Sequence, residues 1–269
     1  MKIDQFLIYD ELPLWSAPFG LTLLETIRFQ PGINILDIGS GAGFPMLEIA
    51  ERFGDASKVY GIDPSDIAQN IINEKSRLKG IQNAHIIKGR GEELPFDSDF
   101  FGLIISNNGL NNVQDVEKTM NECFRVAKNG AQMVLTMNLP HTMIEFYDVF
   151  EQILLEQHLS DLIQQMKEHI MEKRKPVEFW KERILNAGFR IKTINVDGFR
   201  YRYADGTAFF RHSFIREAFL KPWKNIVPIE SESIIFELIE NRLNEIADER
   251  GELVMSVPFV CFDCIKEGC

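Results

Sequence analysis

The first half of the chain alternates between short aliphatic runs and longer stretches with helical periodicity. Strands are predicted at 33–38, 58–63, 85–88, 103–106 and 132–137, and helices at 46–53, 65–78 and 116–127. Short runs of β-branched and aliphatic residues are typical of strands buried on both faces. Because strands that alternate with helices favour a parallel sheet, we expect an α/β fold with a doubly wound, mostly parallel sheet.

The pattern changes on both sides of this region. Residues 1–30 and the stretch after Pro140 carry apolar residues at helical spacing, and a last extended run follows Gly251. After 176 we expect a helix at 177–187, a strand at 190–196, and helices around 209–219 and 234–246. We therefore expect one domain, 1–269, made of N-terminal lid helices (1–30), a ligand-binding core (31–140), a helical insertion (141–175), a return to the core (176–204), a helical cap (205–250) and a last strand with a tail (251–269).

Composition narrows the class of protein. The 269 residues include 29 Lys and Arg against 40 Asp and Glu, a net charge of -11, which disfavours a nucleic-acid partner because the chain repels phosphate. No apolar run approaches the roughly 18 residues of a membrane span, and charged residues near Met1 argue against a signal peptide. We expect a cytoplasmic protein with no membrane partner, whose four cysteines suit a reducing compartment.

The sharpest local signal is a glycine loop that follows a strand, Asp37-Ile38-Gly39-Ser40-Gly41-Ala42-Gly43. Glycines there permit unusual backbone angles and let a ligand approach the main chain. A dinucleotide site requires a further glycine where Phe44 stands, so pyrophosphate binding is disfavoured. Asp37 is placed to meet an ammonium group, and Asp63, at the end of the next strand, to accept both hydroxyls of a ribose. Together they suit a nucleoside that carries an amino acid, although each alone is also explained as a cap.

With these residues the chain resembles the class I S-adenosylmethionine-dependent methyltransferases, whose first motif is an acidic residue followed by Gly-x-Gly-x-Gly. Two later segments, 91–97 and 101–107, resemble the small-molecule branch that includes ubiquinone and menaquinone biosynthesis methyltransferases. The resemblance covers residues 15–196 and the final strand. It implies a Rossmann-like methyltransferase fold with a seven-stranded sheet, helical lid insertions and S-adenosylmethionine as the cofactor.

The resemblance also implies which residues bind the cofactor. The expected contacts are Asp37, Gly39, Ser40, Gly41 and Gly43 for the methionine half, Asp63 and Pro64 for the ribose, Gly91 and Glu92 near the adenine, and Asn107, Trp15 and Phe19. One position departs from the family, because Arg90 stands where Asp is frequent. We therefore expect Glu92 or a backbone carbonyl to accept the hydrogen bond from the adenine amino group.

Methyl transfer from a sulfonium is an in-line displacement with a neutral leaving group, so we expect no metal and no covalent intermediate. Well-oriented reactants gain roughly 7–11 kcal/mol over the bimolecular reaction. His141 is the candidate base if the acceptor keeps its proton, and an exposed loop or capping residue is the alternative reading. Asn108, Tyr201 and Arg211 are the predicted acceptor contacts, with Tyr203 beside them. Arginine side chains pair with carboxylates and stack on rings, so this cluster suits an anionic or aromatic acceptor, and an edge strand with a solvated charged face is the alternative.

Other functions stay open at this point. A non-catalytic binder of S-adenosylmethionine or its product is one, because Arg90 departs from the family and no base is certain. A macromolecular methyltransferase is another, against which stand the net charge and the sequence Ser106-Asn107-Asn108-Gly109. An arsenite-type methyltransferase would use Cys261, Cys264 and Cys269, yet residues three apart on a strand point to opposite faces. The expected partner is a small-molecule acceptor, with a homodimer left open.

Overall fold

The computed structural model describes residues 3–268, with side-chain surroundings described from residue 14 onward. The chain divides into two compact units. The core unit comprises Met1–Asn138, Lys175–Asp197 and Phe259–Cys269, and the second unit comprises Leu139–Arg174 and Gly198–Pro258. Strands β6 (Phe189–Tyr203) and β7 (Leu253–Lys266) each belong partly to both units.

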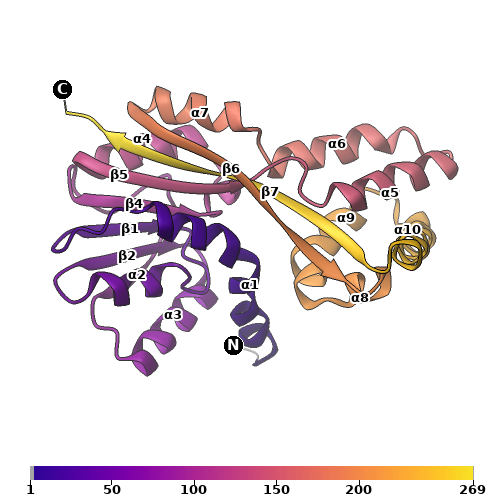
Figure 1. Cartoon of the computed structure of the whole chain (residues 1–269), viewed down its shortest axis with the longest axis horizontal. Coiled ribbons are helices and arrows are strands. Elements are labelled where there is room, and N and C mark those ends of the chain that lie inside the picture. The colour runs from indigo at the N-terminus through magenta and orange to yellow at the C-terminus, as the bar shows by residue number, and fades with distance from the viewer. Residues whose placement is uncertain (1–2, 269) are drawn as a thin grey trace. The chain divides into compact units, whose positions relative to one another are not determined.

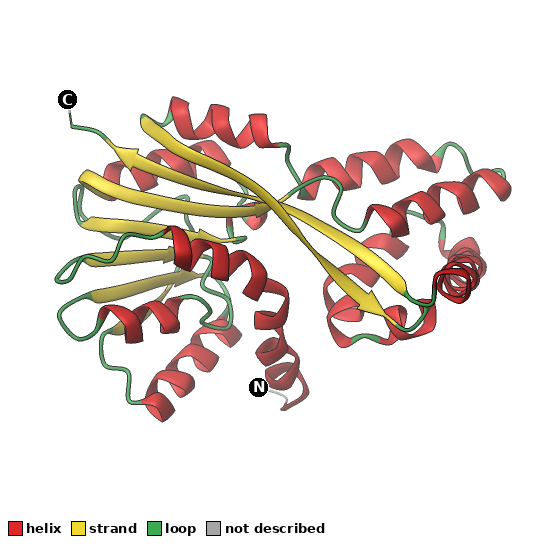
Figure 2. Cartoon of the chain, viewed as in Figure 1, coloured by secondary structure: helices red, strands yellow, loops and turns green. Residues whose placement is uncertain are grey.

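The sheet has seven strands in the order β3-β2-β1-β4-β5-β7-β6 (Figure 2). Its other strands are β1 (Asn34–Ile38), β2 (Lys58–Asp63), β3 (Ala84–Lys88), β4 (Phe101–Asn107) and β5 (Ala127–Asn138). Neighbours among β1 to β5 pair in parallel, and β7 runs antiparallel to β5. The predicted fold class is confirmed. Because strand order reverses between β1 and β4, the carboxyl ends of these two strands border the place where open α/β sheets bind ligands.

Helices of the core unit cover this sheet. They are α1 (Ile3–Thr26), α2 (Met46–Phe53), α3 (Asp66–Lys79), η1 (Leu110–Asn112), α4 (Val116–Val126) and α7 (Val177–Asn186). Figure 1 shows α4 and α7 together, apart from α1, α2 and α3. α2 buries Met46, Ile49, Ala50 and Phe53, the spacing of a single helix face. None of the helices in the described part of the chain is long and apolar enough to cross a membrane.

Local capping sets the bounds of α3, which lie one residue later in the chain than the predicted 65–78 at each end. The Ser65 hydroxyl accepts a hydrogen bond from the backbone N–H of Ala68 (3.3 Å), which satisfies a free donor of the first turn. Gly80 ends the helix in the left-handed conformation, at φ 72°. The end of β2 at Asp63 and the start of α3 are therefore fixed by residues only a few positions apart.

The strand predicted at 132–137 is longer in the structure. β5 begins at Ala127, which pairs with Phe101, and the register shifts before Leu103 pairs with Gln132. Gly130 lies in this irregular stretch at φ 81°. The prediction of a start at 132 was wrong because the first residues are polar and pair only through this shift, which no periodic pattern announces.

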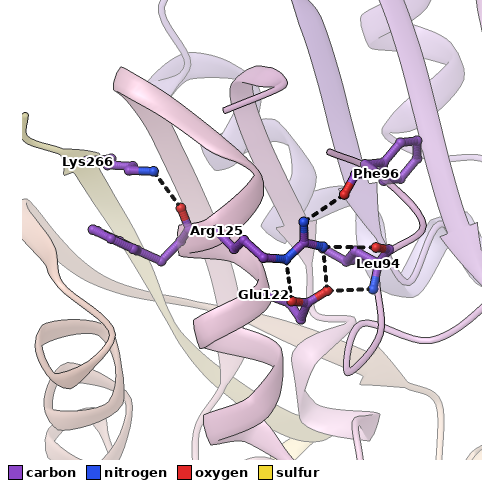
Figure 3. Close-up of polar contacts among 6 residues, drawn as sticks. Leu94, Phe96, Glu122, Arg125 and Lys266 are labelled. Atoms are coloured by element: carbon purple, nitrogen blue, oxygen red, sulfur yellow. Dashed lines mark hydrogen bonds and ion pairs between the residues drawn. The ribbon is translucent and has the colours of Figure 1, made fainter. Parts of the chain in front are cut away.

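Polar side chains fasten α4 to the loop before β4. Arg125 donates to both carboxylate oxygens of Glu122 (2.6 and 2.7 Å) and to the carbonyls of Phe96 (2.7 Å) and Leu94 (3.0 Å) (Figure 3). The Glu122 carboxylate in turn accepts from the Leu94 N–H at 2.8 Å. A bidentate Arg–carboxylate pair of this kind fixes orientation, so this loop is held in one conformation.

Lys266, near the end of β7, is a buried cation with a full set of acceptors. Its ammonium donates to Asp99 (2.9 Å) and to the carbonyls of Phe124 (2.9 Å) and Ala127 (2.7 Å). Three oxygens match the three donors of an ammonium group. The last strand is therefore tied to the segment where α4 ends and β5 begins.

The second unit consists of helices and parts of β6 and β7. The helices are α5 (Ile144–Glu156), α6 (Leu162–Lys173), α8 (Gly206–Arg211), the π-helix η2 (Ile215–Leu220), α9 (Lys221–Lys224) and α10 (Ile229–Arg250). Both predicted insertions are thus helical, although the helix expected around 209–219 is divided near His212 into α8 and η2. The lid function predicted for these segments stays a prediction.

An aromatic core holds the second unit together. Phe146, Tyr147, Phe150, Phe209 and Trp223 are almost fully buried. Phe146 and Trp223 stack with ring centroids 3.9 Å apart. Aromatic side chains bury large areas, so these rings supply much of the hydrophobic stabilisation of this unit.

Arg174 lies within this aromatic core, with 3% of its surface exposed. It donates to the hydroxyl of Tyr147 (3.0 Å), which also accepts from the indole N–H of Trp223 (2.8 Å). The guanidinium lies 5.5 Å from the Tyr147 ring centroid and 5.7 Å from that of Phe219. Within the described residues no carboxylate forms an ion pair with Arg174, so ring faces and one hydroxyl surround this cation.

Candidate active site

The glycine loop leaves the carboxyl end of β1 as predicted. Gly39 adopts φ 78°, and its N–H donates to the carbonyl of Ile62 on β2 (2.8 Å). A Cβ at Gly39 would lie 2.9 Å from the Cα of Gly109, so only glycine allows the loops after β1 and β4 to meet. Ser40 donates from Oγ to the Asp37 carbonyl (3.1 Å), and the Gly43 N–H donates to the Ser40 carbonyl (2.8 Å).

Gly41 plays a different part in the same loop. Its φ is 52°, and a Cβ there would meet no atom within 4 Å, so the loop borders open space at this residue. The Gly41 N–H donates to Asp63 Oδ2 at 2.9 Å. A half-buried loop backbone with open space beside Gly41 and a carboxylate behind it leaves room for a polar ligand.

Asp63 ends β2 beside this loop, as predicted. Its second oxygen, Oδ1, accepts from the N–H of Ser65 at 2.8 Å, so the turn reading of this segment also holds, and Pro64 between them is exposed. Each carboxylate oxygen has used one of its two acceptor sites for a backbone N–H. Both oxygens of Asp63 therefore keep capacity to accept from a pair of hydroxyl groups.

Asp37 is the unusual carboxylate of the core unit. It is fully buried, and neither carboxylate oxygen has a hydrogen-bond partner among the described residues. Burial, with the neighbouring charge of Asp63 second and opposed by Ser40, raises the pKa of Asp37 to about 7. A buried carboxylate without a donor is costly, so this geometry fits a cationic partner such as an ammonium group.

The segment predicted to border the adenine also lies at this edge of the sheet. A Cβ at Gly91 would lie 2.8 Å from the Thr119 methyl group, so the backbone packs closely there. Glu92 Oε1 accepts from the backbone N–H groups of Gln114 (2.7 Å) and Asp115 (3.2 Å) at the start of α4. Glu92 thus stabilises a helix start, which the sequence did not indicate, and its adenine contact stays a prediction.

Asn107 ends β4 beside β1 and connects the sheet to α1. Its amide N–H donates to the Ser16 carbonyl (3.0 Å), and its Oδ1 accepts from the Thr136 hydroxyl (2.9 Å). Trp15 and Phe19 of α1 are both buried, with ring centroids 5.6 Å apart, and Phe19 also contacts Phe259 (5.0 Å). The predicted contacts of Asn107, Trp15 and Phe19 with the cofactor stay predictions.

A cluster of amides follows Asn107. Asn108, at φ 60°, accepts through Oδ1 from the Asn111 amide (2.5 Å) and from the Asn138 N–H (3.0 Å). Asn111 also donates to the side-chain oxygen of Asn138, while its own Oδ1 is buried without a partner among the described residues. Sequence reasoning found Asn108 but missed Asn111 and Asn138, since only strand pairing brings the three together.

The remaining predicted residues belong to the second unit. His141 is exposed and lines a cavity of about 280 Å³ with Arg200 and Phe199. Tyr201 on β6 is half-buried, and burial raises its pKa to about 12. Arg211, in the last turn of α8, is exposed. Their roles toward the acceptor stay predictions.

The cysteines lie apart from these residues. Cys261 and Cys264 are both buried in β7, and Cys269 lies outside the described residues. No group of three or more His, Cys, Asp or Glu suited to a metal occurs in the described part of the chain. Burial raises the pKa of the Cys261 thiol to about 11, so the thiolate that soft metals prefer is disfavoured at neutral pH.

Comparison with known protein families identifies the family to which this chain belongs. A family model described as a methyltransferase domain matches residues 29–196, more than half of the chain. The chain belongs to this methyltransferase family. This membership confirms the resemblance to class I S-adenosylmethionine-dependent methyltransferases expected from the sequence.

Relatives of this methyltransferase agree over its core. A ubiquinone/menaquinone biosynthesis C-methyltransferase UbiE from Vibrio parahaemolyticus is 34% identical over 130 residues, which is 47% of this chain and 50% of the relative. The chain spans about half the length of the curated relatives it matches. The matched region therefore supports the cofactor core and carries no information on the rest of the methyltransferase.

Solved structures support the fold of the methyltransferase over most of its length. YcgJ from Bacillus subtilis has a TM-score of 0.58 at 18% identity, with 94% of this chain and 99% of YcgJ covered. A geranyl diphosphate methyltransferase in complex with S-adenosylmethionine has a TM-score of 0.56 at 15% identity, with 93% and 85% covered. At such identities these likenesses show the fold alone.

Proposed function

We propose that this methyltransferase transfers the methyl group of S-adenosylmethionine to a small-molecule acceptor by in-line displacement. The observation that carries the proposal is the pair of carboxylates beside the glycine loop, of which Asp37 is buried without a hydrogen-bond partner among the described residues. The net charge of -11 argues against a nucleic-acid acceptor, and the relative from Vibrio parahaemolyticus is named for methylation of quinones.

The residues at this edge of the sheet fit the cofactor. Asp37 is suited to an ammonium group, because a cation would stabilise its ionised form in a buried site. Asp63 is suited to two ribose hydroxyls, since each of its oxygens keeps one acceptor site. The backbone at Gly41 leaves room beside both carboxylates. When bound, the cofactor supplies an electrophilic methyl group on a sulfonium.

The chain contributes mainly by holding the reactants in place. Correct orientation lowers the barrier by roughly 7–11 kcal/mol, which is enough for a displacement whose leaving group is neutral. We assign acceptor contacts to Asn108, Tyr201 and Arg211. His141 is proposed as the base for an acceptor that is protonated at neutral pH.

Replacement of Asp63 tests the cofactor assignment. Asp63→Ala is expected to weaken binding of both S-adenosylmethionine and its demethylated product by about 30-fold, because two hydroxyls then lack an acceptor. Calorimetry measures this, with Asp66→Ala, an exposed carboxylate on α3, as the matched control. Equal affinity of Asp63→Ala and wild type would refute the assignment.

A labelling experiment tests the reaction. Incubation of the protein with methyl-labelled cofactor and a cell extract should place the label on a small metabolite. Label on RNA, DNA or protein would instead indicate a macromolecular acceptor. Cofactor binding without any transfer of label would indicate a non-catalytic binder.

A further inference from the structure

The loop after β4 turns sharply at a residue that is not glycine. Asn108 follows the strand at φ 60°, in the left-handed region that favours glycine. Its backbone N–H still pairs with β5 and donates to the carbonyl of Thr136 (2.8 Å). Asparagine tolerates this conformation better than most residues, because its short polar side chain can hydrogen-bond locally. The turn therefore depends on the groups that hold the Asn108 side chain.

Two groups from different elements hold the Asn108 amide. Its Oδ1 accepts from the backbone N–H of Asn138 on β5 (3.0 Å) and from Nδ2 of Asn111 in η1 (2.5 Å). The backbone donor identifies the Asn108 atom as oxygen, and this oxygen requires the nitrogen of the Asn111 amide to face it. The same Nδ2 donates to Oδ1 of Asn138. Asn111 thus joins the side chains of Asn108 and Asn138 through one nitrogen.

The residue after Asn108 packs directly against the end of β1. A Cβ at Gly109 would lie 2.4 Å from the Ile38 carbonyl oxygen and 3.1 Å from the Cα of Gly39. The φ of Gly109 is -72°, which any residue can adopt, so glycine is required there for space alone. The Ser106 hydroxyl donates to the same Ile38 carbonyl at 2.7 Å. The main chain that follows β4 is therefore in contact with the main chain of the glycine loop.

This contact transmits a shift from one loop to the other. Neither Gly109 nor Gly39 has a side chain that could change its rotamer and absorb a displacement. Gly39 is also bound from its other side, because its N–H donates to the Ile62 carbonyl of β2 (2.8 Å). Movement of Gly109 toward β1 would crowd Gly39, and movement away would leave a gap beside it. The turn at Asn108 thus sets how the glycine loop lies.

We propose that Asn111 is a positioning residue for the cofactor. It holds Asn108 in its turn, and through Gly109 it fixes the place of Gly39 in the glycine loop. The role rests on the proposed function, in which that loop binds the methionine half of S-adenosylmethionine. Asn111 itself lies in η1, outside the glycine loop and outside the segments 91–97 and 101–107.

Calorimetry with two probes on the full chain tests this role. S-adenosylhomocysteine carries the amino-acid half of the cofactor, and adenosine lacks it. Asn111→Ala is expected to weaken binding of S-adenosylhomocysteine about fivefold, because a displaced glycine loop fits the amino-acid half less well. Binding of adenosine should change by less than about twofold. Equal losses for the two probes, or unchanged binding of both, would overturn the proposal.

A double-mutant cycle identifies the route through Asn108. Glycine adopts φ 60° without support from a side chain, so Asn108→Gly makes the turn independent of Asn111. In the Asn108→Gly background, Asn111→Ala should therefore weaken binding of S-adenosylhomocysteine by less than about 1.5-fold. The same loss in both backgrounds would mean that Asn111 acts by another route, and the proposal would fail. Binding is measured here, and not turnover, because Asn108 is also assigned to the acceptor.

The same short helix offers a matched control. Asn112 is exposed, so Asn112→Ala removes an identical side chain from η1 and should bind both probes as wild type does. Asn111→Asp, which keeps the shape but replaces the donor with an oxygen, should show the same difference between the probes as Asn111→Ala. Thermal unfolding of each variant establishes that it is folded at the temperature of the measurement. A wild type that binds neither probe would refute the cofactor assignment itself, which separates that failure from a failure of the positioning role.

Discussion

The two units satisfy their buried polar groups in different ways. In the core unit, polar side chains bind the backbone: Lys266 reaches two carbonyls and Asp99, and the Asn83 amide donates to the carbonyls of Ala50, Gly54 and Ser57. In the second unit, Arg174 meets the Tyr147 hydroxyl and ring faces. Lys266 and Asn83 thus hold main-chain carbonyls of the core unit, whereas Arg174 is held by side chains of the second unit.

Some buried polar atoms in each unit have no hydrogen-bond partner among the described residues. Asp37 in the core unit and the pair Tyr203 and His212 in the second unit hold buried polar atoms that the described chain does not satisfy. Asp37 lies where we propose that the cofactor binds, whereas Gln69 Nε2 and Trp180 Nε1, which also lack partners among the described residues, lie at no proposed site. An unsatisfied polar atom therefore indicates a site only together with its surroundings, such as the glycine loop beside Asp37.

The largest expected effect on the free energy of unfolding comes from replacing Asp37 of the core unit. The pKa of Asp37 is about 7 in the folded protein, above the usual 3.8 of an aspartate, so the native state binds more protons than the unfolded state between these pH values. Stability from this group is therefore present below about pH 4 and is lost as the pH rises to about 7, by about 4 kcal/mol. Asp37→Asn removes the charge but leaves a buried amide, and should raise the free energy of unfolding at pH 8 by about 2–3 kcal/mol.

Urea unfolding between pH 4 and pH 8 measures this difference. The gain should vanish near pH 4, and the exposed Asp55→Asn should show no such pH dependence. The same Asp37→Asn variant should bind S-adenosylmethionine more weakly, because the ammonium loses its carboxylate. A variant that is less stable than wild type at pH 8 would mean that Asp37 has a partner in the fold.

The second prediction tests the two buried cations directly. Lys266→Met should destabilise the protein by about 2 kcal/mol, because it leaves buried carbonyls without a donor. Arg174→Met should change the free energy of unfolding by less than about 1 kcal/mol, since a hydrophobic residue of similar volume replaces a cation that has no carboxylate partner. Urea unfolding of both variants decides it, and equal losses would contradict the contrast between the units.

The third prediction separates cofactor binding from acceptor use. Arg211→Ala and Tyr201→Phe lie in the second unit, so the dissociation constant of S-adenosylmethionine should stay within about twofold of wild type. The specificity constant for the acceptor identified by labelling should fall about tenfold, or about 1.4 kcal/mol. Unchanged acceptor kinetics in both variants would remove these residues from the acceptor site.

The smallest expected effect is that of a chelator. A sulfonium already supplies the electrophile, and buried thiols with raised pKa values are poor metal ligands. Turnover should therefore be the same with and without EDTA. Activity that is lost with EDTA and restored by zinc would favour the arsenite-type reading.

Local signals in the sequence were sufficient for the core. Residues 58–63 form β2 with the predicted bounds, and the acids and glycines around it meet as expected, because strand, loop and cap residues lie within a few positions of each other. The early start of β5 was missed because it depends on an irregular pairing with β4. The local sequence pattern of a strand does not show with which distant strand it pairs, or in which register.

In the second unit the helices could be predicted from the sequence, but the full length of β6 and the side-chain contacts could not. Its helices were expected from their periodicity, but the strand predicted at 190–196 continues as β6 to Tyr203. The contact between Tyr203 and His212 was not foreseen, since a break after α8 turns the histidine back toward the strand. A residue can be seen to lack a partner only when its surroundings are known.

The pairing of β5 with β7 has a consequence for how the protein is made. More than a hundred residues of chain separate these neighbouring strands, and the whole second unit is synthesised between them. While translation proceeds, the edge of β5 has no partner, and an unpaired strand edge is a site of aggregation. Such long-range pairing also slows folding. The edge of β5 therefore stays unpaired until β7 has left the ribosome.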